Sequence, residues 1–476
     1  MATSPQPSNA TDLEAAFARQ RTASRQDPAA RYEQRVERLK RLLRAIRDNQ
    51  DRIAAAISSD FGNRSLHESK IAEIFTTVSA IKYTLSHLRR WMKPDTRSVS
   101  LPFAPGGAKV IYQPLGVVGV ISPWNYPFQL GIVPLASALA AGNCVMLKPS
   151  ELTPATSELT ADILAKLFEP ELVYVALGGP ELGATFSGMA FDHLFFTGST
   201  RVGRLVMRAA SENLTPVTLE LGGKSPAIVH DTYPIEKAAD RIAAGKMFNA
   251  GQTCIAPDYV LAPEDRIDSL VEAIQAAVGR RYPSLQTNPD FTSIISVQHR
   301  DRLRGLIDDA KQRGARVIEI NPASESFDDQ LHKLPPTLLL GVNDDMAVMQ
   351  EEIFGPVLPV LGYREINEAF TYVTNHPRPL ALYYFDRDKS RARSALARTV
   401  SGGVSINDTM LHVVQDDLPF GGVGPSGMGA YHGHEGFRTF SHAKGVFHQG
   451  KINAAGFFSP PFGDGVEKLL KWVIGS

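Results

Sequence analysis

The stretch LGVVGVISPWNYPFQLGIVPLASALAAGNCVMLK, residues 115–148, decides the fold class. It opens and closes with short apolar runs, LGVVGVI (115–121) and CVMLK (144–148), which are typical of buried strands. Residues 110–147 carry no charge, and this run is longer than the ~20 residues of a membrane-spanning helix. Pro114, Pro123, Pro127 and Pro134 interrupt any such helix. We therefore predict a buried strand, a ligand-lining turn and a buried helix of an α/β core, and no membrane span.

The same alternation of apolar runs and helical patterns continues on both sides of this stretch. Downstream strand candidates are VYVAL (173–177), HLFFT (193–197), AIVH (227–230), YVLAP (259–263), RVIEI (316–320) and GVSIN (403–407). Helical patterns cover residues 234–250, 264–280 and 297–313, and residues 11–61 form a helical region with an Arg/Lys-rich face that we expect to be solvated. Strands that alternate with helices predict parallel sheets, here in two domains that meet near residues 222–226.

Composition excludes several classes of protein. Lysine plus arginine (50) balance aspartate plus glutamate (50), so the chain lacks the basic surface that a nucleic-acid partner requires. Two cysteines exclude a disulfide framework and favour a reducing, cytoplasmic setting. The first fifteen residues show neither the basic nor the apolar region of an export signal. Apolar residues recur at helical spacing over 464–474, and we expect this tail to dock on the protein surface.

The segment FNAGQTC (248–254) presents a candidate nucleophile. A cysteine after a glycine turn is suited to attack a carbonyl, because a few per cent is already thiolate near neutral pH. Cys144 lies inside an apolar run and is expected to be a buried strand residue. Glu220 lies 34 residues before Cys254, at the end of a predicted strand, where burial would raise its pKa and make it a base. The alternative for Glu220 is a salt-bridged strand end.

Three further segments suggest an oxyanion site and a nucleotide site. Asn125 lies between prolines in SPWNYP and is placed to donate to an oxyanion, with an Asx-turn as the alternative. Lys148 and Glu151 follow a predicted strand, where they are placed to bind ribose hydroxyls. FTGSTRVG (196–203) runs from a strand into a helix and is suited to bind phosphate, although it matches neither G-x-G-x-x-G nor a P-loop. EEIFGP (351–356) and the glycine-rich 419–429 are loop-like.

Taken together and in this order, these segments resemble the NAD(P)-dependent aldehyde dehydrogenase superfamily over residues 12–448. LELGGKSP and FNAGQTC resemble its glutamate and cysteine motifs, and PWNYP, LKPSE, FTGST, EEIFGP and PFGGVG resemble its other landmarks. The C-terminal part resembles the class 3 group. DFGNRS, NAGQTCIAPDYVL and GFRTFSHAK resemble in particular its bacterial coniferyl aldehyde dehydrogenases.

The resemblance implies that Cys254 attacks an aldehyde, that Asn125 and the Cys254 amide hold the oxyanion, and that Glu220 activates the water that hydrolyses the thioester. It implies a Rossmann-like cofactor domain (1–98 and 114–222), a catalytic domain (223–414), an oligomerisation element (99–113 and 415–448) and a tail (449–476). It also implies a homodimer without a metal.

The cofactor is expected to be NAD, which a carboxylate at Glu151 favours, with NADP as the alternative. The residues implied for the cofactor are Trp124, Lys148, Glu151, Gly198, Ser199, Leu221, Glu352 and Phe354.

Tyr126 and His412 are the candidates for the substrate pocket. They are compatible with an aromatic aldehyde such as coniferyl aldehyde, and equally with a medium-chain aliphatic one. Two alternatives stay open: a CoA-acylating aldehyde dehydrogenase, whose relatives generally lack the glutamate base, and a catalytically silent cofactor-binding protein on the same fold.

Overall fold

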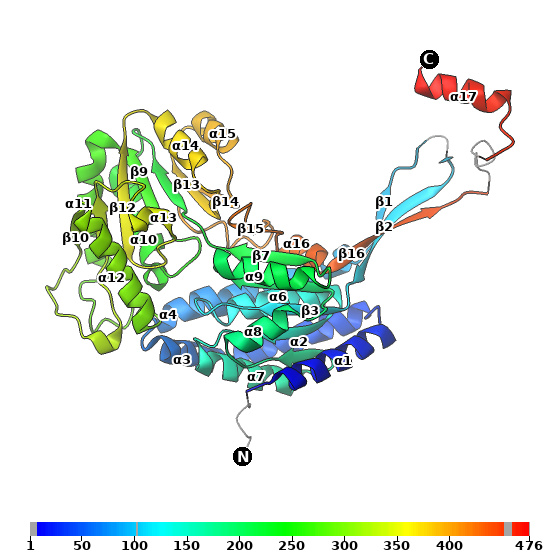
Figure 1. Cartoon of the computed structure of the whole chain (residues 1–476), viewed down its shortest axis with the longest axis horizontal. Coiled ribbons are helices and arrows are strands. Elements are labelled where there is room, and N and C mark those ends of the chain that lie inside the picture. Colours follow the sequence, from blue (N-terminus) through cyan, green and yellow to red (C-terminus); the bar gives the residue numbers. More distant parts are fainter. Residues whose placement is uncertain (1–6, 101–102, 452–458, 476) are drawn as a thin grey trace.

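The computed structural model describes residues 7–100, 103–451 and 459–475. Residues 1–6, part of the segment expected to lack an export signal, lie outside this range, as does part of the predicted tail 449–476. Two large sheets and one small sheet organise the chain (Figure 1). None of the helices in the described ranges combines the length and apolar character that crossing a membrane needs.

A six-stranded sheet forms the first large unit, in the order β15-β7-β6-β3-β4-β5. All of its pairs are parallel except β15 with β7, so the predicted parallel sheet carries one antiparallel edge strand. Its strands are β3 (Val117–Ile121), β4 (Cys144–Lys148), β5 (Val173–Val175), β6 (His193–Gly198), β7 (Val217–Leu221) and β15 (Gly427–Met428).

Helices cover both faces of this sheet, which explains why its strands read as continuous apolar runs. Val117 and Met146 face one side with α1, α8 and α9, whereas Val118 and Val145 face the other with α2, α5, α6 and α7. These helices and their neighbours are α1 (Ala10–Gln26), α2 (Tyr32–Asp48), α3 (Gln50–Phe61), α4 (Leu66–Ser69), the π-helical turn η1 (Lys70–Phe75), α5 (Thr76–Trp91), α6 (Gln129–Ala141), α7 (Pro154–Leu167), α8 (Pro180–Ser187), α9 (Thr200–Ser211) and α16 (Gly433–Thr439). The helical region predicted over residues 11–61 is thus three helices.

A seven-stranded sheet forms the second large unit, in the order β10-β11-β12-β9-β8-β13-β14, with β10 antiparallel at one edge. Its strands are β8 (Pro226–Val229), β9 (Tyr259–Pro263), β10 (Arg316–Glu319), β11 (Thr337–Leu340), β12 (Val357–Tyr363), β13 (Ala381–Phe385) and β14 (Gly403–Ile406). Its helices are α10 (Ile235–Met247), η3 (Phe248–Gly251), η4 (Glu264–Arg266), α11 (Ile267–Arg281), α12 (Val297–Gln312), η5 (Asp329–Leu331), α13 (Ala347–Gln350), α14 (Ile366–Asn375) and α15 (Lys389–Arg398).

An antiparallel arm made of β1 (Asp95–Arg97), β2 (Gly107–Pro114) and β16 (Ser441–His448) projects from the body (Figure 1). The terminal helix α17 (Asp464–Ile474) lies apart from the body, beyond the arm, and none of its residues is buried. The predicted helix is therefore present, but the expectation that it docks on the surface of its own chain is wrong. β16 runs outward along the arm, and α17 lies beyond the body to which the helix was expected to dock.

Candidate active site

A cavity of ≈910 Å³ lies between the two large units. The carboxyl ends of β3, β6 and β7 reach it from the first sheet, and loops that precede β9 and β12 reach it from the second. The predicted site residues that line it are Trp124, Asn125, Gly198, Ser199, Glu220, Leu221, Cys254, Glu352 and Phe354. The fold thus brings together segments that are separated by more than two hundred residues in the sequence.

Cys254 follows a turn with an unusual backbone. Asn249 (φ 51°), Ala250 (φ 50°) and Gly251 (φ 74°) all have left-handed conformations, which side-chain-bearing residues rarely adopt. Gly251 is required here, because a Cβ at this position would lie 2.3 Å from the carbonyl oxygen of Gly355. The turn presents Cys254 to the cavity with its side chain only partly covered.

The surroundings of Cys254 favour the neutral thiol over the thiolate. Burial raises its pKa far above its usual range, and the nearby carboxyl groups of Glu352 and Glu220 raise it further. The backbone N–H groups of Cys254 and Ile255 act in the opposite direction. The fraction of thiolate that an exposed cysteine offers near neutral pH is therefore suppressed, and attack on a carbonyl requires a proton acceptor close to the sulfur.

Glu220 lies near the end of β7 and is only 3% exposed. Neither of its carboxyl oxygens has a hydrogen-bond partner or an ion-pair partner among the described residues. Glu220 is therefore not the salt-bridged strand end that the sequence left as an alternative. Burial raises its pKa well above the usual range. A carboxyl group in this state is a stronger base than an exposed one once it is ionised.

Asn125 lies in the turn between β3 and α6 and is 3% exposed. Its Nδ2 donates to the carbonyl oxygen of Gln252 at 3.1 Å, which leaves the second N–H of the amide for another acceptor. An Asx-turn would need the side-chain oxygen to accept from a nearby backbone N–H, and the described part of the chain shows no such bond. Asn125 is thus tied to the loop that carries Cys254.

Residues at the end of β6 form the part of the cavity suited to a nucleotide. Ser199 caps α9, with its Oγ accepting from the Val202 amide at 3.4 Å, and the N-terminus of this helix faces the cavity, where it attracts anions. The hydroxyl of Thr197 beside it has no partner in the described residues. Lys148 and Glu151 form an ion pair of 2.9 Å at the end of β4 and are not among the residues that line the cavity.

Glu352 and Phe354 lie in the loop that precedes β12 of the second large unit. The Glu352 carboxyl lies directly over Gly222, where a Cβ would be only 1.8 Å from Oε2. Burial, and then the charge of Asp258, raises the pKa of Glu352 to about 8, while the Gly223 amide opposes the rise. Its Oε1 has no partner within the described residues and so can accept from a bound hydroxyl.

Phe354 has a left-handed backbone (φ 55°), and its ring meets that of Trp124 edge to face, with centroids 5.4 Å apart. The cavity therefore offers an anion site, unpaired acceptors for ribose hydroxyls and an aromatic wall, which together fit a nicotinamide dinucleotide.

Tyr126 and His412 lie outside the wall of this cavity. The Tyr126 hydroxyl bonds to Thr253 Oγ1 at 2.6 Å, and the His412 ring packs behind Phe420, which does line the cavity, with centroids 6.1 Å apart. Their assignment to the substrate pocket stays a prediction. The cavity residues that sequence reasoning missed include Phe420 and Tyr431, which only the fold brings to this site.

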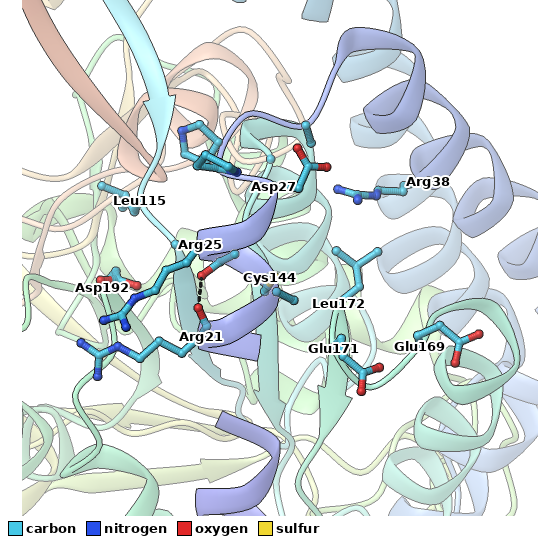
Figure 2. Close-up of a pocket in the computed structure, with 17 residues that line it drawn as sticks. Arg21, Arg25, Asp27, Arg38, Leu115, Cys144, Glu169, Glu171, Leu172 and Asp192 are labelled. Atoms are coloured by element: carbon cyan, nitrogen blue, oxygen red, sulfur yellow. Dashed lines mark hydrogen bonds between the residues drawn. The ribbon is translucent and has the colours of Figure 1, made fainter. Parts of the chain in front are cut away.

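A second cavity of ≈540 Å³ lies at the opposite, amino ends of β3 and β4 (Figure 2). Cys144 lines it beside Arg38 and is only 7% exposed. Burial raises the pKa of the Cys144 thiol to about 11, although Arg38 opposes the rise. The prediction that Cys144 is a buried strand residue is confirmed. No cluster of three or more His, Cys, Asp or Glu side chains suited to a metal occurs in the described ranges.

Comparison with known proteins identifies the family. The model of the Aldehyde dehydrogenase family matches residues 2–446. A probable coniferyl aldehyde dehydrogenase of Pseudomonas aeruginosa is 54% identical over 96% of this chain and 95% of its own length, and a coniferyl aldehyde dehydrogenase of Pseudomonas sp. is 48% identical over 99% and 98%. Mouse aldehyde dehydrogenase family 3 member B3 is 40% identical over 93% and 91%, as the resemblance to class 3 predicts.

The structural comparison agrees. A structure of Staphylococcus aureus AldH in a substrate-bound state superposes with a TM-score of 0.91 at 37% identity, covering 97% of this chain and 99% of that one. The predicted superfamily and α/β fold are therefore confirmed. The chain belongs to the aldehyde dehydrogenase family and is an NAD(P)-dependent enzyme that oxidises an aldehyde to the carboxylic acid.

Proposed function

We propose that Cys254 is the nucleophile, Asn125 the oxyanion donor and Glu220 the base of this oxidation. The observation that carries the proposal is their convergence in one cavity: a partly covered thiol, a buried amide with a free N–H, and a buried carboxyl group without a partner among the described residues.

The first step forms a bond between Cys254 Sγ and the aldehyde carbon. The ionised carboxylate of Glu352 accepts the thiol proton, since its pKa, raised to about 8, brings its basicity closer to that of the sulfur. The carbonyl oxygen becomes an oxyanion, to which Asn125 Nδ2 and the Cys254 amide donate. A donor of this kind is typically worth ~10²–10³ in rate.

NAD(P), when bound, would supply the hydride acceptor, and loss of hydride from the adduct carbon would leave a thioester on Cys254. Glu220 then takes a proton from water, and the resulting hydroxide attacks the thioester carbon. The bond to sulfur breaks, the carboxylic acid leaves and the thiol is restored. Because Glu220 has no bonded partner in the described part of the chain, its carboxylate is available to hold this water.

The cofactor is held, on this proposal, by residues at the sheet edge and on the facing loops. Ser199 and the α9 amides receive the pyrophosphate, Lys148 and Glu151 the adenosine ribose, and Glu352 the nicotinamide ribose. Gly198, Leu221, Trp124 and Phe354 shape the surface against which it lies. Glu151 supports NAD as the preferred cofactor, because its carboxylate repels a 2′-phosphate, and NADP is the alternative. The proposed domain boundaries are those implied by the resemblance. The two large sheets support the cofactor-binding and catalytic ranges, although β15, within 415–448, pairs with the first of these sheets.

The proposed substrate is an aromatic aldehyde such as coniferyl aldehyde, with a medium-chain aliphatic aldehyde as the alternative. The names of the Pseudomonas relatives support the aromatic choice, and so do the aromatic rings of Trp124, Phe354, Phe420 and Tyr431 in the cavity wall. His412 supports this wall by stacking behind Phe420, and Tyr126, whose hydroxyl bonds to Thr253 next to Cys254, is proposed for the same pocket.

A symmetric homodimer and a cytoplasmic location are also proposed. The arm is exposed along β16, where Phe447 is 50% exposed, and such a surface is suited to a second copy of the chain. Two free cysteines agree with a reducing compartment. Light scattering tests the dimer, and a monomeric mass contradicts it.

The deciding experiment is initial-rate formation of reduced cofactor over cinnamyl, benzyl and alkyl aldehydes, with NAD and with NADP, in the presence and absence of CoA. We expect the highest kcat/KM with a cinnamyl aldehyde and NAD, and release of free acid without CoA. A strict requirement for CoA would favour the CoA-acylating alternative, and no turnover of any aldehyde would favour a silent cofactor-binding protein.

A further inference from the structure

Three charged side chains are buried together in the segment that joins α3 to α5. Arg64 is 1% exposed, Glu68 9% and Glu73 0%. None of them lines the catalytic cavity, and the mechanism above does not use them. Burying charges costs free energy unless each is paired and hydrogen-bonded, so their contacts indicate what the cluster does.

Arg64 and Glu73 hold the turn that carries Asn125. Arg64 Nη1 donates to Glu73 Oε1 at 2.8 Å and to the main-chain oxygen of Asn125 at 3.0 Å. The other oxygen of Glu73 accepts from the amides of Phe128 and Gln129 at 2.9 Å, at the start of α6. Glu73 lies in the π-helical segment η1, and π-helical segments often occur at functional sites. The Asn125 turn is thus tied to this cluster at Asn125 itself and at its C-terminal end.

Glu68 holds the loop that carries Cys254. Its Oε2 accepts from the main-chain amide of Asn249 at 3.1 Å and from Thr292 Oγ1 at 3.0 Å. Asn249 is the first of the left-handed residues before the nucleophile, so this bond stabilises a strained conformation. The charge of Arg64 also acts on Glu68, which makes the three groups one electrostatic unit.

Asn249 connects the two halves. Its Nδ2 donates to the main-chain oxygen of Asn125, the same atom that Arg64 contacts, and to that of Gln252, both at 3.1 Å. Asn125 Nδ2 donates to the same Gln252 oxygen. Arg64 thus contacts one of the two shared acceptors, and Glu68 holds Asn249, whose side chain donates to both.

We propose that Arg64, Glu68 and Glu73 are positioning residues that set the placement of the Asn125 amide relative to Cys254, and so determine how well the oxyanion is stabilised. The inference rests on the proposed roles of Asn125 and Cys254. It goes beyond them because it assigns control of their geometry to the N-terminal segment 64–73, which touches neither substrate nor cofactor. A displacement of about 1 Å in such a site costs on the order of 10²-fold in rate.

The first test compares Arg64→Lys with Arg35→Lys. Arg35 is a matched control, because it is 4% exposed and donates to the Ala140 oxygen at the opposite end of α6. Two rates are measured for each protein: aldehyde oxidation, which passes through an oxyanion, and alkylation of Cys254 by iodoacetamide, which does not. We expect Arg64→Lys to lower kcat/KM for aldehyde by about 10- to 100-fold while alkylation stays within about twofold, and Arg35→Lys to change neither. Parallel loss of both rates in Arg64→Lys would show a merely structural role and overturn the proposal.

A double-mutant cycle with Asn125→Ala separates this inference from the proposed function. If Arg64 acts through Asn125, then Arg64→Lys has no further effect on kcat/KM in the Asn125→Ala protein. If Asn125→Ala is impaired but the two effects add, the positioning role fails and the oxyanion role stands. If Asn125→Ala alone has wild-type kcat/KM, the oxyanion role fails and the positioning role fails with it.

Glu68 provides an independent test if Arg64→Lys does not fold. Glu68→Gln keeps a side-chain oxygen that can accept from the Asn249 amide, whereas Glu68→Ala removes it. We expect Glu68→Ala to lower kcat/KM by about tenfold or more. We expect Glu68→Gln to keep most of the wild-type kcat/KM, and the cofactor affinity of both variants to be unchanged. Equal activity of the two variants would contradict a role through that hydrogen bond.

Discussion

Replacing Glu220 by Gln removes the proposed base and changes the shape of the side chain very little. Because both carboxyl oxygens of Glu220 are without partners in the described residues, the substitution breaks no hydrogen bond there. A neutral amide also resembles the protonated carboxyl, which is the form that burial favours. The Gln variant should therefore fold normally and differ from wild type in the ability to take a proton from water.

General base catalysis is typically worth 10²–10⁴-fold, or about 3–5 kcal/mol of activation free energy. We expect Glu220→Gln to form one equivalent of reduced cofactor per chain at nearly the wild-type rate, and then to stall as the thioester, with steady turnover lowered by that factor. Stopped-flow detection of the reduced cofactor resolves the two phases.

Unfolding midpoints provide the control. A carboxyl whose pKa is raised by folding contributes stability that is present below its unfolded pKa and lost as pH rises through the folded value. Glu220→Gln should then have the wild-type Tm at acidic pH and a higher Tm at alkaline pH. If the variant shows a burst followed by steady turnover within about fivefold of wild type, Glu220 is not the base and the reasoning is refuted.

Four other substitutions or conditions give separate tests. Asn125→Ala should lower kcat/KM for aldehyde by about 10²–10³-fold with cofactor affinity unchanged, as measured by initial rates and fluorescence titration; a loss below about fivefold would exclude an oxyanion role. Activity should fall as pH drops below about 8, because Glu352, whose pKa is raised to about 8, and Glu220 become protonated, and a pH–rate profile that is flat there would contradict this. Glu151→Gln should narrow the preference for NAD over NADP, measured as the ratio of the two kcat/KM values, and an unchanged ratio would exclude Glu151 from the ribose site. Deleting residues 452–476 should leave Tm unchanged, since no residue of α17 is buried, and a drop of several degrees would mean that the helix packs on the protein in solution.

The fold was predictable where apolar pattern and secondary structure coincide. The runs 117–121 and 144–148 are strands that helices cover on both faces of the sheet. Strands in this position are apolar along their whole length, and this pattern in the sequence predicted them. The strands β11, β12 and β13 went unpredicted, although their runs TLLL, VLPVLGY and ALYYF are as long as runs that were assigned to strands. Pro359 in the second run argues against a central strand. Residues 464–474 show a second limit of prediction from sequence. Their apolar spacing predicts a helix, but it does not tell whether the apolar face packs on the rest of the chain.

Most of the residues predicted for the site line the cavity, whereas Lys148, Glu151, Tyr126 and His412 do not, and the electrostatics of the site could not be predicted. Cys254, Glu220 and Asn125 stand in recognisable motifs, yet the suppression of the thiolate depends on burial and on Glu352, which lies 98 residues further along the chain than Cys254. Arg35 lies within residues 11–61, whose Arg/Lys-rich face was expected to be solvated, but the structure buries it, and it donates to the Ala30 and Ala140 carbonyls. Charged residues such as Arg64 carry no local signal that distinguishes a buried pair from a surface one, because their partners come from distant segments.

The central claim is that oxidation proceeds through a thioester on Cys254. Mass spectrometry of peptides from Glu220→Gln, quenched after the first turnover with an aldehyde and NAD, tests it most directly. We predict an acyl adduct of the substrate on the peptide that contains Cys254, an unmodified Cys144 peptide, and no adduct in Cys254→Ala. An adduct on any other residue, or a Cys254→Ala protein that still reduces NAD with aldehydes, would contradict the mechanism.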